Sequence, residues 1–513
     1  MKADTRYNTL LLYLLLAAVA LSFFYNIHMA PLFDLDEGAF SEATREMFLR
    51  GDFISTYLNG EPRYDKPILI YWLQAASVAL FGINEFAFRL PSALAATAWV
   101  TTVFLFVKAV RNTQTAFFAA IIMATTLEIS VMGKAATADA LLNLFITAAM
   151  LSGYLFFQQK RRKHLYLMFL FMALGFLTKG PVAVMIPLVV SFMFYAIKGD
   201  LKSWLKAIFN PAGITLFIAV AMPWYVAQYL KEGDAFIQGF FFKHNLSRFQ
   251  EGMEGHTGNL LYYLPVILLG VLPYTTVLIG SLARVRDIIK DDLRLFLALW
   301  FAFVFIFFSL SSTKLPHYVV YGYPPLFILM ALHLPNLRSK FLLFLPPLLL
   351  FLTLLFLPEM IGYALPNIKD TFAQSALAGY QEYFTAGYRL FFALAALLTL
   401  YFMIEKRFTN INKIFACGLF TIFALSHFVI PLAGRLQQEP IKEAALIAKQ
   451  HNYAVVMWQL NTPSFNVYSE RLVEKREPRV GDVVLTKSIF LPKLNRFEIL
   501  YQKNGIALVK VLS

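Results

Sequence analysis

The stretch Leu10–Phe24, LLLYLLLAAVALSFF, contains no charged side chain and opens a series of apolar runs that recurs almost to the end of the chain. A helix needs about 20 apolar residues to cross a bilayer, where lipid offers no partner to an unpaired backbone group. Lys2 and Arg6 precede this run, as in a signal peptide, but no small-residue cleavage site follows it. We therefore interpret the run as an uncleaved first membrane span.

The composition of the whole chain supports this interpretation. Of the 513 residues, 59% are hydrophobic and 15% are charged, whereas soluble domains are about 45 to 50% apolar and about 25% charged. The net charge is +14, but Lys and Arg occur in short clusters between apolar runs, which argues against nucleic acid as a partner. Cys417 is the only cysteine and lies in an apolar run, so the chain has no internal disulfide and no cysteine-based metal site.

Thirteen apolar runs are predicted to span the membrane, which gives the fold class of a polytopic α-helical membrane protein. The runs lie near 10–30, 91–110, 114–132, 139–157, 165–178, 181–197, 207–228, 259–282, 293–311, 317–334, 341–357, 388–404 and 413–432. With this set, the basic clusters near Lys108, Lys160, Lys198, Arg284, Arg338 and Lys406 all fall on one side, the cytoplasm. Counting 68–81 as a further span would invert the later clusters, so we place it as a helix at the outer interface.

Besides the connection 133–138 and the loop 229–258, two larger regions are predicted to lie outside the membrane on the far side from the cytoplasm. One is a first outer loop, about 31–90, within a transmembrane domain that covers residues 1–434. The other is a small soluble α/β domain at 435–513. In it, the pattern predicts a helix at 441–450 and strands at 454–460, 483–487, 497–502 and 506–511. No internal repeat is evident, which argues against the inverted repeats of secondary transporters.

Carboxylates at the outer surface are candidate catalytic residues. Asp36 and Glu37 follow the first span by a few residues, and Asp139 opens the fourth span. Each of these acids stands where it can simply cap the next helix. Two carboxylates that meet at one surface can also form a pair in which one takes a proton from an acceptor hydroxyl and the other orients it. Both interpretations stay open on the residues alone.

Cations on the same side are candidate phosphate ligands. The first outer loop contains Arg63-Tyr64-Asp65-Lys66-Pro67, and Lys314 lies between two spans where the positive-inside pattern disfavours a cation. Lys179 is a third outward cation, in a tight connection between helices. Such side chains can extend to phospholipid headgroups. They can also neutralise the charge on a departing lipid phosphate, which is the sharper hypothesis.

Two histidines, His244 and His256, lie in the loop before the eighth span. A single loop histidine is more often solvated than a metal ligand, and the chain has no HExxH or CxxC spacing. A metal site would have to be assembled from distant residues, so the metal ligands stay unknown at this point.

The order and spacing of several motifs resemble those of the GT-C transferases related to lipid A aminoarabinose transferases and protein O-mannosyltransferases. The motifs are Asp36-Glu37-Gly38-Ala39-Phe40-Ser41-Glu42, Tyr64-Asp65-Lys66-Pro67, Asn84-Glu85-Phe86-Ala87-Phe88-Arg89-Leu90-Pro91-Ser92, Leu177-Thr178-Lys179-Gly180-Pro181, His244-Asn245-Leu246-Ser247-Arg248-Phe249 and Ser312-Thr313-Lys314-Leu315-Pro316. The resemblance implies a GT-C fold and an inverting transfer from a polyprenyl-phosphate sugar at the periplasmic face of a bacterial inner membrane. It implies lipid A, another glycan or a protein as the acceptor.

The resemblance also implies roles for single residues. Asp36 matches the catalytic acid of the family, Asp139 its second acid, and Lys66 a lysine beside the donor phosphate. Asp65 stands where aminoarabinose transferases often have a glutamate that holds a metal ion together with a loop histidine. Asp65 and His256, or alternatively His244, are therefore the candidate ligands of a divalent metal, although Asp65 is one methylene shorter. The expected site is completed by Glu37 on the acidic side and by Lys314, Arg63, Tyr64 and Tyr318 on the phosphate side.

Two other classes of function use similar chemistry. A polyprenyl-linked glycan polymerase or ligase shares the donor, and a lipid transporter also needs outward cations. A transporter is expected to place polar groups at mid-membrane in broken helices, whereas the candidate residues of this chain gather at one rim.

Overall fold

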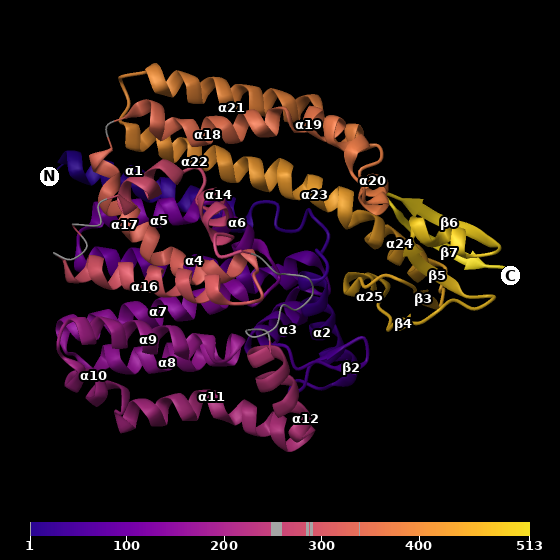
Figure 1. Ribbon diagram of the computed structural model, residues 1–513, viewed down its shortest axis with the longest axis horizontal. Helices are drawn as coiled ribbons and strands as arrows, with labels where there is room; N and C mark the ends of the chain where they lie inside the picture. The colour runs from indigo at the N-terminus through magenta and orange to yellow at the C-terminus, as the bar shows by residue number, and fades with distance from the viewer. Residues whose placement is uncertain (1, 248–258, 284–286, 288–290, 338) are drawn as a thin grey trace.

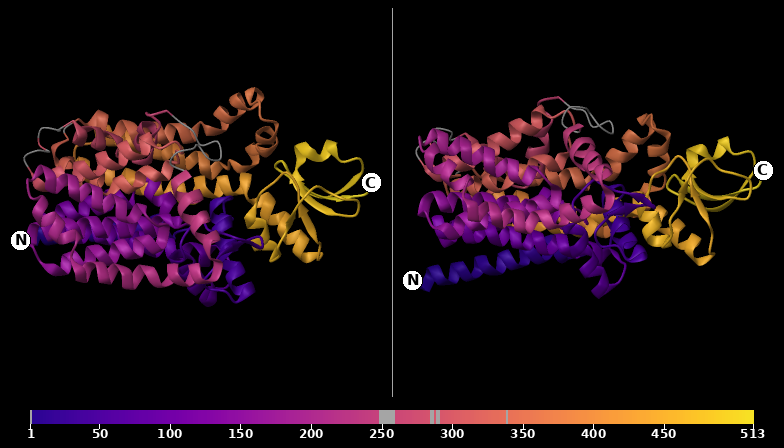
Figure 2. Two further views of the ribbon diagram at one scale, coloured as in Figure 1. Left: turned by 60° about the horizontal axis from the view of Figure 1, so that its bottom comes forward. Right: turned by 90° about the horizontal axis from the view of Figure 1, so that it is seen from below.

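The computed structural model describes residues 2–247, 259–283, 287, 291–337 and 339–513. Long helices run side by side, with the N-terminus at one end of the molecule and a small sheet at the other (Figure 1). Two rotated views show the same order along the long axis (Figure 2). We call the end that bears the sheet, α2 (Asp36–Arg50) and α3 (Leu69–Phe81) the capped end.

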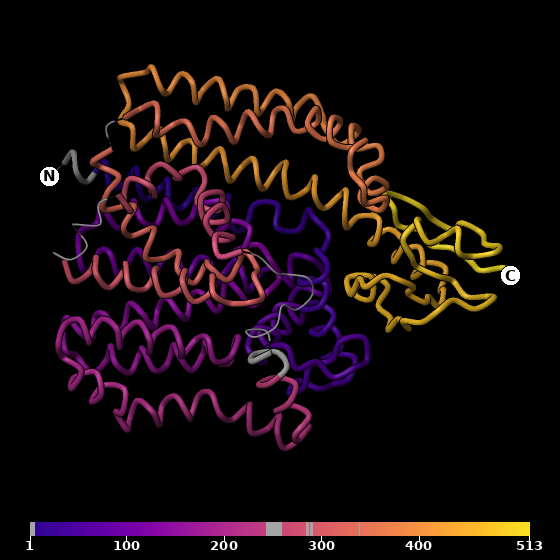
Figure 3. Tube along the Cα trace, viewed as in Figure 1, coloured from indigo at the N-terminus to yellow at the C-terminus, as the bar shows by residue number. Residues whose placement is uncertain are grey.

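Apolar helices make up the rest of the membrane domain, and the tube in Figure 3 follows their order along the chain. Their bounds are α1 Lys2–Val19, α4 Glu85–Val110, α5 Thr113–Ala124, α6 Leu127–Lys134, α7 Asp139–Gln159, α8 Arg162–Lys179, α9 Val182–Ile197, α10 Leu201–Ile208, α11 Pro211–Glu232, α12 Asp234–Ile237, α14 Tyr263–Gly270, α15 Thr275–Leu282, α16 Asp292–Leu310, α17 Tyr323–His333, α18 Lys340–Leu355, α19 Leu357–Ala364, α20 Thr371–Ala376, α21 Ala386–Ile404, α22 Asn410–Ala424 and α23 Ile430–Gln437. The π-helical turn η1 (Ala20–Phe24) extends α1, and the 3-10 segment η4 (Pro316–Gly322) leads into α17.

Fewer helices than predicted are long enough to span a bilayer. In the described part of the chain, 8 helices are long and apolar enough, or up to 10 if the bent pairs α5 with α6 (66°) and α18 with α19 (58°) each count once. All thirteen predicted runs coincide with helices, but three of them do not meet these limits. Helix α8 carries three cations, α9 has 16 residues, and 259–282 breaks into α14 and α15. The predicted fold class is confirmed, and thirteen overstates the number of long spans because hydropathy does not reveal breaks.

The connections that carry the basic clusters lie together at the end opposite the capped end. Figure 1 shows this for the connections α4–α5, α7–α8, α9–α10 and α21–α22. The prediction that these clusters share one side of the membrane domain is thus confirmed for the described residues.

The first loop forms a platform at the capped end. The acids Asp36 and Glu37 stand in the first turn of α2, where they are favourable for the helix dipole, and Gly51 (φ 64°) ends it. A two-strand hairpin, β1 (Tyr57–Leu58) and β2 (Glu61–Pro62), connects it to α3. Helix α3 packs against α2 and α4. Its 13 residues rise about 20 Å, short of the roughly 30 Å hydrocarbon core, as expected of the predicted interfacial helix.

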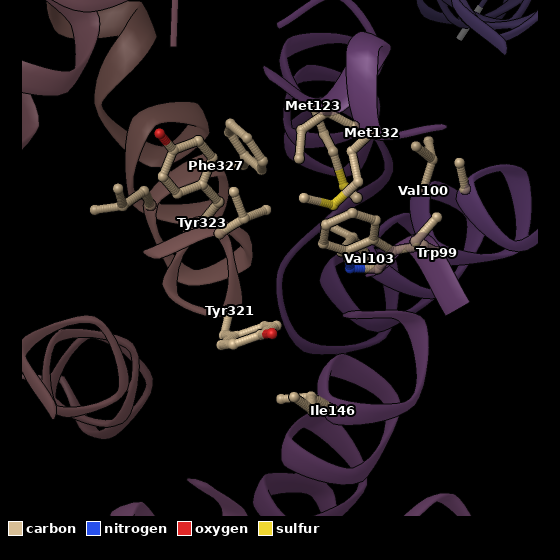
Figure 4. Close-up of a cluster of buried hydrophobic side chains, with 14 of the residues drawn as sticks. Trp99, Val100, Val103, Met123, Met132, Ile146, Tyr321, Tyr323 and Phe327 are labelled. Atoms are coloured by element: carbon tan, nitrogen blue, oxygen red, sulfur yellow. The ribbon is translucent and has the colours of Figure 1, made fainter. Parts of the chain in front are cut away.

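A large apolar core holds η4 and α17 against α4, α5 and α7. Trp99 on α4 is fully buried and its indole N–H donates to Thr147 Oγ1 at 2.7 Å. Figure 4 shows Trp99 and Met123 facing Tyr323 and Phe327 across this core. The 3-10 segment that carries His317 is therefore held in place against the spans.

The C-terminal domain is a five-stranded mixed sheet with two helices. Its elements are α24 Glu439–Gln450, β3 Val455–Met457, α25 Pro463–Ser469, β4 Glu474–Lys475, β5 Val483–Lys487, β6 Phe497–Lys503 and β7 Ile506–Val511, in the sheet order β4-β3-β5-β7-β6. Strand β3 runs parallel to β4 and β5, whereas β7 is antiparallel to β5 and β6. The predicted helix and four strands are confirmed, while β4 and α25 were not foreseen.

Helix α25 fastens this domain to the first loop. The backbone N–H and the hydroxyl of Ser464 donate to the two carboxylate oxygens of Asp34, at 3.0 and 2.5 Å. The Leu32 N–H donates to the Tyr468 hydroxyl at 2.7 Å. Asn59 donates to the Val473 carbonyl at 2.6 Å, and α25 packs against α2. The candidate catalytic loop is thus held by residues more than 400 positions away.

Candidate active site

Asp36 is the first residue of α2, and its side chain is exposed at the capped end. It interacts electrostatically with Arg63 of the same loop and with His317 of η4. His317 in turn interacts with Asp139. The two acids that the sequence predicts to meet at one surface therefore share His317 as a neighbour.

Glu37, the next residue, is buried and its oxygens are occupied. It forms a two-bond ion pair with Arg89 (Nε–Oε1 2.8 Å, Nη2–Oε2 2.7 Å) and accepts from the N–H groups of Phe33 and Ala136. Arg89 also donates to three carbonyls, those of Ile27, Ala30 and Pro31. These bonds fix the exit of the first span and the loop that carries Asp36.

Asp139 is the centre of a charged cluster. It begins α7, its side chain is 13% exposed, and one oxygen lies 2.5 Å from Lys179 Nζ at the end of α8. The hydroxyl of Thr137 donates to the other oxygen at 3.2 Å. Asp139 also interacts electrostatically with His317 and Lys66. Four separate segments, the first loop, α7, α8 and η4, thus bring their charged groups to one place.

Arg63 presents donors that no described residue uses. Its side chain is 11% exposed, Nη2 donates to Asp65 Oδ2 at 3.2 Å, and the guanidinium carbon lies 5.3 Å from the centre of the Phe40 ring. Nε and Nη1 are buried without a hydrogen-bond partner. Leaving a buried donor unpaired costs about 1–3 kcal/mol, so such donors point to an anion that the site binds.

Lys66 lies beside this cluster, but Tyr64 points elsewhere. Lys66 Nζ donates to the Asp65 carbonyl at 3.1 Å and interacts electrostatically with both Asp139 and His317. The Tyr64 hydroxyl donates to Glu232 at the end of α11, at 3.1 Å. Tyr318 lies with its ring centre 5.7 Å from Lys179 Nζ, close enough for a cation–π contact.

The structure gives less support to the remaining candidates, Lys314, Asp65 and His256. Lys314 is 6% exposed and donates to the Ser311 carbonyl at 2.6 Å, and none of its described contacts joins it to Asp139 or Lys66. One Asp65 oxygen accepts from Arg63, and His256 lies outside the described residues. The described residues contain no group of three or more His, Cys, Asp or Glu that could hold a metal ion. The metal site therefore stays a prediction.

Sequence reasoning missed two contributors to this site. His317 lies between Lys314 and Tyr318, the two candidates predicted from this motif, and its place at the start of an apolar run was the available signal. Ser464 lies in the C-terminal domain and carries no signal, because only the fold brings it to Asp34.

Comparison with known proteins gives sequence relatives of this chain. Residues 65–226 match the family model of dolichyl-phosphate-mannose-protein mannosyltransferase. The chain is 32% identical over 337 residues to an undecaprenyl phosphate-alpha-4-amino-4-deoxy-L-arabinose arabinosyl transferase of Yersinia enterocolitica, covering 63% of this chain and 60% of the relative. It is also 32% identical to the corresponding transferase of Aeromonas hydrophila, covering 62% and 59%. The alignments thus span about three fifths of these curated relatives.

A solved structure shares the whole fold. The crystal structure of ArnT from Cupriavidus metallidurans bound to undecaprenyl phosphate superposes with a TM-score of 0.80 at 18% identity, covering 98% of both chains. Its apo state gives a TM-score of 0.77 at 19% identity, covering 99% of this chain and 98% of that one. The resemblance to GT-C transferases drawn from the motifs is confirmed: the chain is related in sequence to aminoarabinose and protein mannosyltransferases, and it shares the fold of ArnT.

Proposed function

We propose that this relative of the aminoarabinose transferases is an inverting glycosyltransferase that moves a sugar from a polyprenyl-phosphate donor to a lipid, glycan or protein acceptor. One observation carries the proposal. An exposed carboxylate, Asp36, and a buried arginine with two unused donors, Arg63, lie in one electrostatic cluster with Asp139, Lys66 and His317. A base and an anion site side by side are what attack on a phosphate-linked sugar requires.

The anion site suits the phosphate of the donor. Arg63 offers two unused donors, Nε and Nη1, on a planar guanidinium, and each can donate to a phosphate oxygen. Lys66 adds a positive charge near the same acids. Phosphate binding by these cations stabilises the charge that grows on the leaving group as the sugar departs.

Asp36 serves as the general base in this proposal. It accepts the proton of the acceptor hydroxyl while the hydroxyl oxygen forms a bond to the anomeric carbon. The bond between that carbon and the phosphate oxygen breaks, and polyprenyl phosphate leaves with the electron pair. A single displacement from the opposite face inverts the configuration.

Asp139 and Glu37 take supporting roles. Asp139 is held by Lys179 and orients the sugar between the base and the phosphate. Glu37 has its oxygens filled by Arg89 and by backbone N–H groups, so we assign it to positioning the catalytic loop and not to proton transfer.

We propose that the reaction takes place at the periplasmic face of a bacterial inner membrane. The basic connections lie opposite the capped end, and the positive-inside rule places them in the cytoplasm. The donor class is supported by the relatives, whose names specify undecaprenyl phosphate linked to an amino sugar.

The test is to incubate the purified protein with several undecaprenyl-phosphate sugars, with and without lipid A, glycan or protein acceptors, and to measure free undecaprenyl phosphate. We expect release that depends on an acceptor and is lost in D36N. A lipid transporter would release none. Release of undecaprenyl phosphate at equal rates by wild type and D36N would remove Asp36 as the base.

A further inference from the structure

Glu128 is a carboxylate inside the membrane domain, and no cation among the described residues lies beside it. It is the second residue of α6, and it is partly buried. Its charged neighbour is Asp139, which is also an anion, and the hydroxyl groups of Tyr262 and Tyr323 lie within electrostatic range. Among the described residues, none forms a hydrogen bond or an ion pair with the carboxylate of Glu128. Acids in this position are usually paired or functional.

Two broken helices meet around this carboxylate. Helices α5 and α6 bend by 66°, and α14 and α15 are interrupted at 271–274. The Leu127 N–H donates to the Leu272 carbonyl at 3.1 Å across the two breaks. Irregular backbone within a membrane domain is tolerated where it is buried in protein or lines a polar site, and breaks in spans commonly mark binding sites.

A second polar group points to a ligand at the same place. The Tyr323 hydroxyl is buried and has no hydrogen-bond partner. A Cβ added to Gly270 would lie 2.5 Å from that hydroxyl and 3.3 Å from Glu128 Cβ, so hydroxyl and acid flank the same glycine. An oxygen of Tyr323 and the carboxylate of Glu128 can together accept from a donor with several N–H groups.

A purely structural role accounts poorly for Glu128. An acid in the first turn of a helix interacts favourably with the helix dipole. The free energy gained is small compared with the cost of dehydrating an unpaired carboxylate. Proximity to Asp139 adds repulsion between two like charges. A cation supplied by the substrate would remove both penalties.

We infer that Glu128, with Tyr323, binds an ammonium group on the donor sugar and so selects amino sugars. This inference rests on the proposed function. The proposed function puts the donor phosphate at Arg63 and Lys66, Lys66 interacts electrostatically with Asp139, and Asp139 interacts electrostatically with Glu128. The sugar attached to that phosphate is therefore the part of the substrates that reaches Glu128, whereas Asp36, the base for the acceptor, is not among its neighbours.

The test compares two donors that differ in one group, undecaprenyl phosphate 4-amino-4-deoxyarabinose and undecaprenyl phosphate arabinose, with the acceptor that supports turnover. The readout is the ratio of kcat/KM for the amino donor to that for the hydroxyl donor. We expect E128Q to lower this ratio at least about tenfold, because the amide cannot neutralise an ammonium group in a buried site. E359Q is the matched control, because Glu359 of α19 forms an exposed ion pair with Arg389 of α21. The kcat/KM ratio of E359Q should equal that of wild type.

The outcomes separate the inference from the proposed function. An unchanged ratio in E128Q, with undecaprenyl phosphate still released, overturns the inference and leaves the transferase intact. Absence of release from both donors by the wild type removes the proposed function and the inference with it. Thermal unfolding verifies that E128Q is folded, and if it is not, Y323F decides, because loss of one acceptor should lower the ratio in the same direction.

Discussion

Asp36 and Glu37 are adjacent in the chain but have opposite surroundings. The Asp36 carboxylate is exposed and its neighbours are Arg63 and His317, whereas Glu37 is buried with both oxygens bonded. We expect D36N to lower transfer about 100- to 10,000-fold, the range for losing a general base, with little change in the midpoint of thermal unfolding. We expect E37Q to destabilise the fold by about 3–5 kcal/mol, because Arg89 is left as an unpaired buried charge. Turnover assays and thermal scans of both variants check this contrast, and a stable E37Q would contradict the positioning role.

Arg63 differs from the other cations of the site in having two buried N–H groups without a partner. We expect R63K to raise the KM for the donor about tenfold or more, because lysine keeps the charge but loses the two planar guanidinium donors, Nε and Nη1, that are unused in the structure. The KM for the acceptor should stay near its wild-type value. R389K, which changes an exposed ion pair on α21, is the control. Equal donor KM values for R63K and wild type would place the phosphate elsewhere.

Helix α25 is the element that ties the C-terminal domain to the catalytic loop. Asp34, two residues before Asp36, accepts both hydrogen bonds that Ser464 donates. Burial raises the pKa of Asp34 to about 7, although the bonds from Ser464 oppose the rise. The folded state therefore holds a proton that the unfolded chain releases above its ordinary pKa of about 4.

This pKa predicts a dependence of stability on pH. The stabilisation from protonated Asp34 is fully present below about pH 4 and is lost as the pH rises through about 7. Between pH 5 and pH 8 we expect the unfolding midpoint of wild type to fall more steeply than that of D34N, because asparagine does not titrate. Parallel pH profiles for wild type and D34N would show that Asp34 does not titrate in this range.

S464A should lower transfer, because it weakens the attachment of the first loop to α25.

The molecule as a whole is polarised along its helices. Charged site residues and the sheet are at the capped end, and the connections that carry the basic clusters are at the other (Figure 1). The single cysteine, Cys417, is buried, which gives a low background for cysteine labelling. In intact cells stripped of their outer membrane, we expect a membrane-impermeant maleimide to label K510C in the C-terminal sheet. K163C, in the first turn of α8, should react only after the membrane is opened.

The orientation test has a clear contrary result. Labelling of K163C and protection of K510C in sealed cells would put the capped end in the cytoplasm. The donor would then have to be used at the cytoplasmic leaflet, and the proposed periplasmic reaction would be wrong.

Local properties of the chain were enough to predict the class of the molecule and most of its elements. An apolar run such as Leu10–Phe24 requires lipid whatever its neighbours are, and the short apolar, valine-rich runs in 483–487 and 506–511 predict strands at those positions. The order of the basic clusters along the chain also predicted that Asp36, Lys66 and Asp139 share one side of the membrane domain, and the periplasm as that side stays a prediction. Breaks within spans did not follow, since the segment 259–282 is apolar throughout its interruption at 271–274.

Pairing was decided by tertiary structure alone. Nothing in the residue order distinguishes Glu37, whose oxygens accept hydrogen bonds from Arg89, from Asp36, which stays exposed. Likewise, nothing in the residue order links Asp34 to Ser464 across 430 positions. Among the described residues, the two N–H groups of Arg63 without a partner and the Glu128 carboxylate without a cation likewise depend on which segments surround them. Transfer from water to lipid depends on the composition of a segment, whereas the partner of a charge depends on which segments the fold brings within a few ångströms.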